Sequence, residues 1–198
     1  MKKIMFNDKY GLTKAVLEGR KTQTRRIINL KDHDKEYLDT AFDWDFREMV
    51  VSDDYAKYKV GEVVAIAQSY KDIFSAFSQH HNPQLNICVK NPTDTAGWSN
   101  KMFVKAEVMP HQIRITKVRI ERLQDISDED CLKEGIIKYT KDRTVFKYDL
   151  SDGFEMFSWK DMKRSPREAY AALIDKVGKK GDWESNPYVF VYDFELIK

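Results

Sequence analysis

Cysteine is scarce in this chain of 198 residues, and long apolar runs are missing. The 2 cysteines, Cys88 and Cys131, are too few for a disulfide framework, which is typical of a protein from a reducing compartment. Apolar runs such as 63–67 and 188–192 are far shorter than the ~20 residues of a membrane-spanning helix. The opening Met-Lys-Lys is not followed by the apolar stretch of a secretory signal. We therefore expect a cytoplasmic protein that makes no membrane contact.

An excess of charge of one sign is also missing. The chain has 34 basic and 32 acidic residues, so its formal net charge is only +2, and any site for nucleic acid must be local. However, 42% of the residues are hydrophobic, and 4 Trp, 10 Tyr and 11 Phe provide bulk for a core, which argues against intrinsic disorder. At this length we expect a single domain that spans residues 1–198.

Several motifs that would define a reaction are absent from the sequence. It has no GxGxxG and no GxxxxGK[ST], which disfavours nucleotide-cofactor folds, and no GxSxG elbow, although composition alone leaves a Ser/His/Asp triad open. His80, His81 and Cys88 place three candidate metal ligands within nine positions. No CxxC, HExxH or second ligand pair at zinc spacing accompanies them, so a polar loop is the preferred interpretation. We expect neither a metal nor a cofactor.

The pattern of apolar and capping residues predicts three helices. Apolar residues at i, i+3, i+4 and i+7 predict the first at 10–18. The second is expected at 128–134, and the third at 166–177, where Ser165 and Glu168 form a capping box around a proline at the first helical position. The N-caps of the last two helices are Ser127 and Ser165. The glycines that end the three helices are Gly19, Gly135 and Gly178.

Non-alternating strands are predicted between these helices. The β-branched run 63–67 is typical of a buried strand. Residues 102–121 are expected to form two strands or one bent strand, because the apolar alternation changes phase near residue 116, which suggests a bulge. A hairpin is expected over 139–157, and the run 188–197, apolar on both faces, indicates a central strand. Together these elements predict an α+β fold with a mixed or barrel-like sheet.

The most informative segment is 19–26, which reads Gly-Arg-Lys-Thr-Gln-Thr-Arg-Arg and holds four cations in eight positions. A turn of this composition combines charge, hydroxyls and backbone N–H groups, as an anion site or a lysine-activated hydroxyl nucleophile requires. Lys21 and Thr24 lie together if the chain turns helically, whereas a strand directs them to opposite faces. A solvated basic loop is the alternative.

Glu134 is the second candidate, because it falls in the last turn of a predicted helix. There the helix macrodipole disfavours a carboxylate by ~0.3–1 kcal/mol. Such departures from local rules are enriched at functional sites. Lys133 and Lys138 lie near enough in the sequence to offset the charge, so a surface glutamate is the alternative.

Several blocks of the sequence, taken together, resemble the ASCH domain family in its longer bacterial and phage form. The blocks are 19–26, Lys59-Val60-Gly61-Glu62, 115–127, Glu134-Gly135-Ile136, and Trp183 with Asn186-Pro187. The resemblance implies a PUA-like fold, a small β-barrel of mixed strands with helices packed at its openings. It also implies a cleft that takes RNA or a modified nucleoside. Residues 29–57, 70–100 and 138–163 are divergent or inserted segments on this reading.

The resemblance also implies a reaction. Smaller members of the family hydrolyse the acetyl amide of N4-acetylcytidine with a Lys, a Thr three residues on and a distant Glu, which Lys21, Thr24 and Glu134 match. Lys21 would then ease deprotonation of Thr24, Thr24 would attack the acetyl carbonyl, and Glu134 would carry a proton to the leaving amine. The residues expected to bind substrate are Arg20, Arg25, Arg26 and Gln68.

One departure from the family pattern concerns the end of the strand after the Lys-Val-Gly turn. Long members often carry a Trp-Val-Arg-Glu type ending there, whereas this chain has Ala65-Ile66-Ala67-Gln68. Recognition of a base edge depends on such polar groups, so the substrate is expected to differ in detail. Two alternatives remain open: a non-catalytic RNA- or nucleotide-binding module that holds phosphate with the same basic turn, and an accessory protein whose pocket serves protein contacts.

Overall fold

The computed structural model describes residues 1–29, 36, 40, 55–75, 81–82, 87–88, 95–149 and 159–197. The chain divides into two compact units. Unit 1 comprises Met1–Phe6, Val63–Arg114 and Leu196–Lys198, and unit 2 comprises Asn7–Glu62 and Ile115–Glu195. No helix in the described ranges is long and apolar enough to cross a membrane.

Unit 1 contains a small mixed sheet. Strand β1 (Lys3–Ile4) runs parallel to β3 (Val63–Ile66), which is antiparallel to the first residues of β6 (Gln112–Arg122). The predicted strand at 63–67 is thereby confirmed. The other elements of the unit are α4 (Tyr70–Ser75), β4 (His81–Asn82), β5 (Ile87–Cys88) and the 3-10 helices Lys101–Phe103 and Ala106–Val108.

The prediction of a strand across 102–111 is wrong, because β6 begins only at Gln112. A side chain from elsewhere in the unit, that of Lys3, contacts the beginning of this stretch, which forms a 3-10 turn instead. The ammonium group of Lys3 donates to three neighbouring backbone carbonyls there, those of Lys101 (3.3 Å), Met102 (2.6 Å) and Val104 (2.8 Å). Carbonyls that receive a lysine ammonium are drawn to one point, which a straight strand does not allow.

Gly97 packs against the side chains of Val104 and Tyr70 in unit 1, and we expect that it tolerates no side chain. Its φ of +92° is rare for L residues, and an added Cβ would lie 2.9 Å from Val104 Cγ2 and 3.1 Å from Tyr70 Cε2. Gly97→Ala should therefore lower the free energy of unfolding by more than the ~1–3 kcal/mol of backbone strain alone. Gly61→Ala is the control, because Gly61 has a similar φ of +82° with nothing within 4 Å of the added Cβ. Equal losses in urea unfolding of the two variants would contradict the expected clash.

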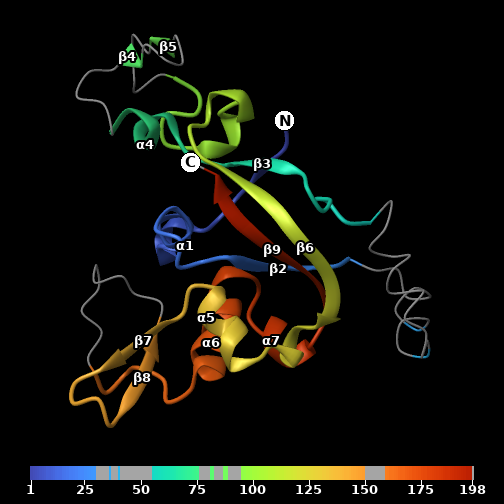
Figure 1. Ribbon diagram of the computed structural model, residues 1–198, viewed down its shortest axis with the longest axis vertical. Coiled ribbons are helices and arrows are strands. Elements are labelled where there is room, and N and C mark those ends of the chain that lie inside the picture. Colours follow the sequence, from blue (N-terminus) through green and yellow to red (C-terminus); the bar gives the residue numbers. More distant parts are fainter. Residues whose placement is uncertain are drawn as a thin grey trace. The chain divides into compact units, whose positions relative to one another are not determined.

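Unit 2 contains three neighbouring strands. Strand β9 (Tyr188–Ile197) lies between β6 and β2 (Gln23–Ile27), and pairs antiparallel with β2. The prediction of a central strand at 188–197 is confirmed. The remaining elements are α1 (Leu12–Leu17), α5 (Asp128–Lys133), β7 (Ile137–Thr140), β8 (Phe146–Asp149), α6 (Pro166–Val177), α7 (Asp182–Ser185), and the 3-10 helices Asp8–Tyr10 and Leu123–Asp125. Figure 1 shows α5 and α6 side by side.

The predicted N-caps of α5 and α6 are confirmed, whereas α1 is shorter than the predicted 10–18 and α5 ends one residue before the predicted 134. The Ser127 hydroxyl accepts from the Asp130 N–H (3.1 Å), and the Ser165 hydroxyl accepts from the Glu168 N–H (3.1 Å). The reciprocal half of the capping box differs by one residue, because the Glu168 carboxylate accepts from the N–H of Arg164 (3.2 Å) instead of that of Ser165. These caps satisfy N–H groups that a helix leaves without an internal partner.

The change of phase predicted within β6 is present, and the strand is continuous. Ile113, Ile115 and Ile120 are buried, whereas Thr116 and Lys117 are both exposed. The hairpin predicted over 139–157 begins as β7 and β8, and its second predicted turn, at 152–153, lies outside the described residues. The fold class is therefore α+β with a mixed sheet, and among the described residues the strands of neither unit close into a barrel.

Candidate functional site

The chain reverses between α1 and β2, and this reversal places the basic segment beside the end of α5. Gly19 has a φ of +73°, after which the N–H groups of Arg20 and Lys21 both donate to the Ala15 carbonyl (2.9 Å each). The Thr22 N–H then donates to the Lys133 carbonyl (2.9 Å), which fixes the segment to the last turn of α5. A left-handed glycine at this point is what lets the chain leave the helix and enter β2 at once.

Lys21 and Glu134 form a buried ion pair in unit 2. The Lys21 Nζ lies 2.5 Å from Glu134 Oε2 and 2.8 Å from the Glu134 backbone oxygen, and both residues are at most 3% exposed. Burial lowers the pKa of Lys21, although the charge of Glu134 acts in the opposite direction. The Lys21 ammonium thus donates both to the Glu134 carboxylate and to a backbone carbonyl at the C-terminus of α5. This pairing explains how a glutamate is tolerated there.

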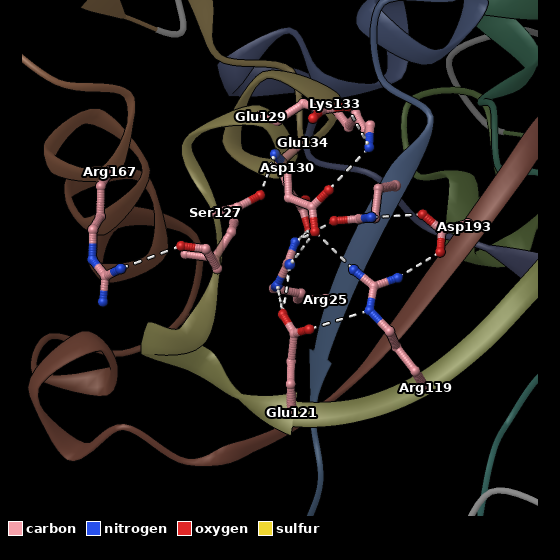
Figure 2. Close-up of polar contacts among 12 residues, drawn as sticks. Arg25, Arg119, Glu121, Ser127, Glu129, Asp130, Lys133, Glu134, Arg167 and Asp193 are labelled. Atoms are coloured by element: carbon pink, nitrogen blue, oxygen red, sulfur yellow. Dashed lines mark hydrogen bonds and ion pairs between the residues drawn. The ribbon is translucent and has the colours of Figure 1, made fainter.

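Arg25 is the centre of the surrounding network, and all five of its N–H donors are used (Figure 2). Nε and Nη2 both donate to Glu121 Oε1, at 2.8 and 2.6 Å. Nη1 donates to Gln23 Oε1 and to Glu134 Oε1, and Nη2 also donates to Asp130 Oδ2 at 3.2 Å. Burial opposes the charge of this guanidinium, but the carboxylates of Glu134 and Glu121 raise its pKa above the usual value. Arg25 therefore carries a permanent charge that three carboxylates share.

The network continues through Arg119, whose contacts with Glu121, Asp130 and Asp193 are drawn in Figure 2. The Arg119 guanidinium binds Glu121 (3.2 Å), Asp130 (2.8 Å) and Asp193 (2.6 Å), and Asp193 also accepts from the Gln23 amide (2.6 Å). These four charged side chains are 16–27% exposed, in contrast to the buried Lys21–Glu134 pair. The network thus leads from partly exposed charges into the interior of unit 2.

Thr24 lies on the opposite face of β2 from this network. It is flanked in the strand by Gln23 and Arg25, whose side chains both join the network, and successive side chains of a strand point to opposite faces. Its cross-strand partner is Tyr192, and Thr24 is itself buried. Of the three residues expected to be catalytic, the structure therefore brings together Lys21 and Glu134, with Thr24 on the other side of the sheet.

The four expected substrate-binding residues are dispersed. Arg20 binds the carboxylate of Glu18 through Nε and Nη2 (2.8 and 2.6 Å), and Arg25 belongs to the network described above. Arg26 shares the face of Thr24 by strand alternation. Gln68 follows β3 in unit 1, where it is buried and its Oε1 has no hydrogen-bond partner among the described residues.

The three candidate metal ligands are only partly described by the structure. His80 and the side chains of His81 and Cys88 lie outside the described residues. Within the described part of the chain, no group of three or more His, Cys, Asp or Glu side chains has the arrangement of a metal site.

Sequence reasoning missed Gln23, Arg119, Glu121, Asp130 and Asp193. The pairs at positions 23 and 25 and at 119 and 121 each share one face of a strand, so polar residues at a period of two were the available signal. The residues at 23 and 25 are remote in sequence from those at 119 and 121. They come together only because β2, β6 and β9 are neighbours in the sheet.

The buried ion pair can exchange a proton, which is its main chemical capacity. In a site without bulk water a carboxylate 2.5 Å from a lysine of lowered pKa can hold, accept or return that proton.

No family model, curated protein or solved structure was found to match this chain.

Proposed function

We propose that this protein is an amidohydrolase of the ASCH type, which removes the acyl group from N4-acetylcytidine or a related small amide. The observation that carries this proposal is the buried contact of 2.5 Å between Lys21 and Glu134. Buried groups with a perturbed pKa, as Lys21 has, are concentrated at catalytic sites. The same two positions match the Lys and the Glu that the family resemblance implies, and a PUA-like barrel is part of the same proposal.

The proton transfers follow from the charge states of this pair. The proton of the Lys21 ammonium first moves to the Glu134 carboxylate that it contacts, which leaves the Lys21 amine neutral. Lys21 then accepts a proton from the attacking nucleophile, which adds to the carbonyl carbon of the amide. Glu134 gives the proton that it received from Lys21 to the departing nitrogen, and the carbon–nitrogen bond breaks. The products are the carboxylic acid and the free amine, here cytidine, and the pair returns to its starting state.

The position of Thr24 favours water as the nucleophile. Its side chain lies on the face of β2 away from Lys21 and Glu134, so direct proton transfer from its hydroxyl to Lys21 is geometrically disfavoured. We therefore expect Thr24→Val, which removes the hydroxyl at nearly constant volume, to keep kcat within about threefold of the parent, against the 10²–10⁴-fold effect of losing a proton-transfer group. The measurement is steady-state hydrolysis of N4-acetylcytidine. Loss of all turnover in this variant would show that Thr24 attacks the substrate, as the resemblance implies.

The alternative of a non-catalytic module that holds RNA phosphates with the basic turn is less well supported. Three of the four cations of that turn are already engaged: Arg20 binds Glu18, Lys21 binds Glu134, and Arg25 gives all five donors to the protein. A phosphate would have to displace these carboxylates before it could bind. Filter binding with a single-stranded RNA separates the two functions, because an RNA-binding module would show affinity that falls with salt and no turnover.

A further inference from the structure

Tyr170 is a buried side chain next to the proposed site, and its hydroxyl has no partner in the part of the chain that the structure describes. It lies on α6, is 1% exposed, and its oxygen makes no hydrogen bond to any residue that the structure describes. Buried hydroxyls are nearly always hydrogen-bonded, because leaving one without a partner costs about 1–3 kcal/mol. Such a group calls for a ligand or another physical explanation.

The surroundings of Tyr170 are those of the ion-pair network. The Arg25 guanidinium lies 6.0 Å from the centre of its ring, and the Trp183 ring packs edge-on at 6.2 Å. Burial raises the pKa of Tyr170 well above its ordinary value, and the negative charge of Glu134 acts in the same direction. The hydroxyl is therefore protonated at neutral pH and remains a hydrogen-bond donor.

Tyr170 differs from Arg25 in having a donor that is not already used. All five N–H groups of Arg25 are bound to side chains of the network, and Lys21 donates to two oxygens of Glu134. A ligand that enters this part of unit 2 thus finds an O–H donor at Tyr170. The ligand atom that complements it is an acceptor such as a carbonyl oxygen.

We propose that the Tyr170 hydroxyl donates a hydrogen bond to the acyl oxygen of the amide substrate and stabilises that oxygen as it becomes negatively charged. This inference rests on the proposed amidohydrolase function. When the nucleophile adds to the carbonyl carbon, the electron pair of the C=O π bond moves to the oxygen, and the hydroxyl binds it without giving up its proton. When the intermediate collapses, the C=O bond forms again and the carbon–nitrogen bond breaks, with the proton for nitrogen coming through Glu134. A donor prearranged for this oxygen lowers the barrier.

Tyr170→Phe tests the role directly, because it removes a hydroxyl that makes no hydrogen bond to any described residue. The unfolding temperature is expected to stay equal to the parent value or to rise. The kcat for N4-acetylcytidine is expected to fall about 10²-fold, the lower range for loss of one such donor. A purely structural role would give the opposite pattern, with altered stability and unchanged kcat.

Tyr192→Phe is the matched control. Tyr192 is also buried, but its hydroxyl is hydrogen-bonded to the backbone at Lys57 and Tyr58. Its loss should lower the unfolding temperature and leave kcat unchanged. If the parent protein releases cytidine and Tyr170→Phe does so at the same kcat, the role of Tyr170 is refuted and the amidohydrolase function stands. If the parent protein itself releases no cytidine, both proposals are wrong.

Discussion

Replacing Arg25 with leucine is expected to lower the free energy of unfolding by about 3–5 kcal/mol. The substitution leaves the carboxylates of Glu121, Asp130 and Glu134 without the guanidinium that they share, and Glu134 is buried. Removing one partner of a buried charge network is far more costly than replacing the whole network, because the remaining charges stay desolvated. Urea unfolding monitored by tryptophan fluorescence measures the loss.

Two further variants make the Arg25 prediction specific. Arg25→Lys should also be destabilised, because an ammonium cannot reproduce the planar set of five donors that meets three carboxylates at once. Arg20→Leu is the control, because Arg20 is partly exposed and its contact described above is with Glu18. We expect this substitution to lower the free energy of unfolding by less than about 1 kcal/mol. If Arg25→Leu and Arg20→Leu lose the same stability, the network does not contribute as described.

Lys21→Met is expected to reduce the turnover of N4-acetylcytidine by about 10²–10⁴-fold, the usual contribution of a general acid or base. The substitution keeps an unbranched chain of similar length but removes the amine that accepts the proton. Glu134→Gln should lose turnover to a similar extent, because the amide cannot carry the proton from Lys21 to the leaving nitrogen. Glu134 keeps the Arg25 contact when Lys21 is replaced, so the Lys21→Met protein is expected to fold.

The control for the Lys21 variant is Lys14→Met. Lys14 belongs to α1, is about half exposed, and pairs with Glu18 at 3.9 Å on the helix surface. The same substitution there should leave kcat unaltered, because Lys14 lies on the helix surface, whereas Lys21 is buried against Glu134. Folded Lys21→Met protein, checked by circular dichroism, that keeps parental turnover would remove Lys21 from the mechanism.

The helices of unit 2 were largely predictable because their signals are local. Ser127 and Ser165 cap their helices through hydrogen bonds to residues three positions on, and Gly178 ends α6. The segment 102–111 was not predictable, because the interaction that bends it comes from Lys3, about a hundred positions earlier. Such tertiary contacts override the local preference for a strand, and they cannot be predicted from the pattern of neighbouring residues.

The candidate site was predictable in part for the same reason. Glu134 attracted attention because a carboxylate at the end of a helix breaks a local rule, and the structure supplies the compensating cation, Lys21. The sequence could not tell whether the segment 19–26 turns helically or runs as a strand. The structure adopts the strand from Gln23, which separates Thr24 from Lys21 and recruits Arg25 instead.

Incubation of the purified protein with N4-acetylcytidine, followed by chromatography for cytidine and acetate, tests the proposed function most directly. We expect the two products to appear in equal amounts with the parent protein, and Lys21→Met and Glu134→Gln to release them at least about a hundredfold more slowly. Release of cytidine at the parental rate by both variants, or no release by the parent protein over a range of N4-acylated cytidines, would contradict it.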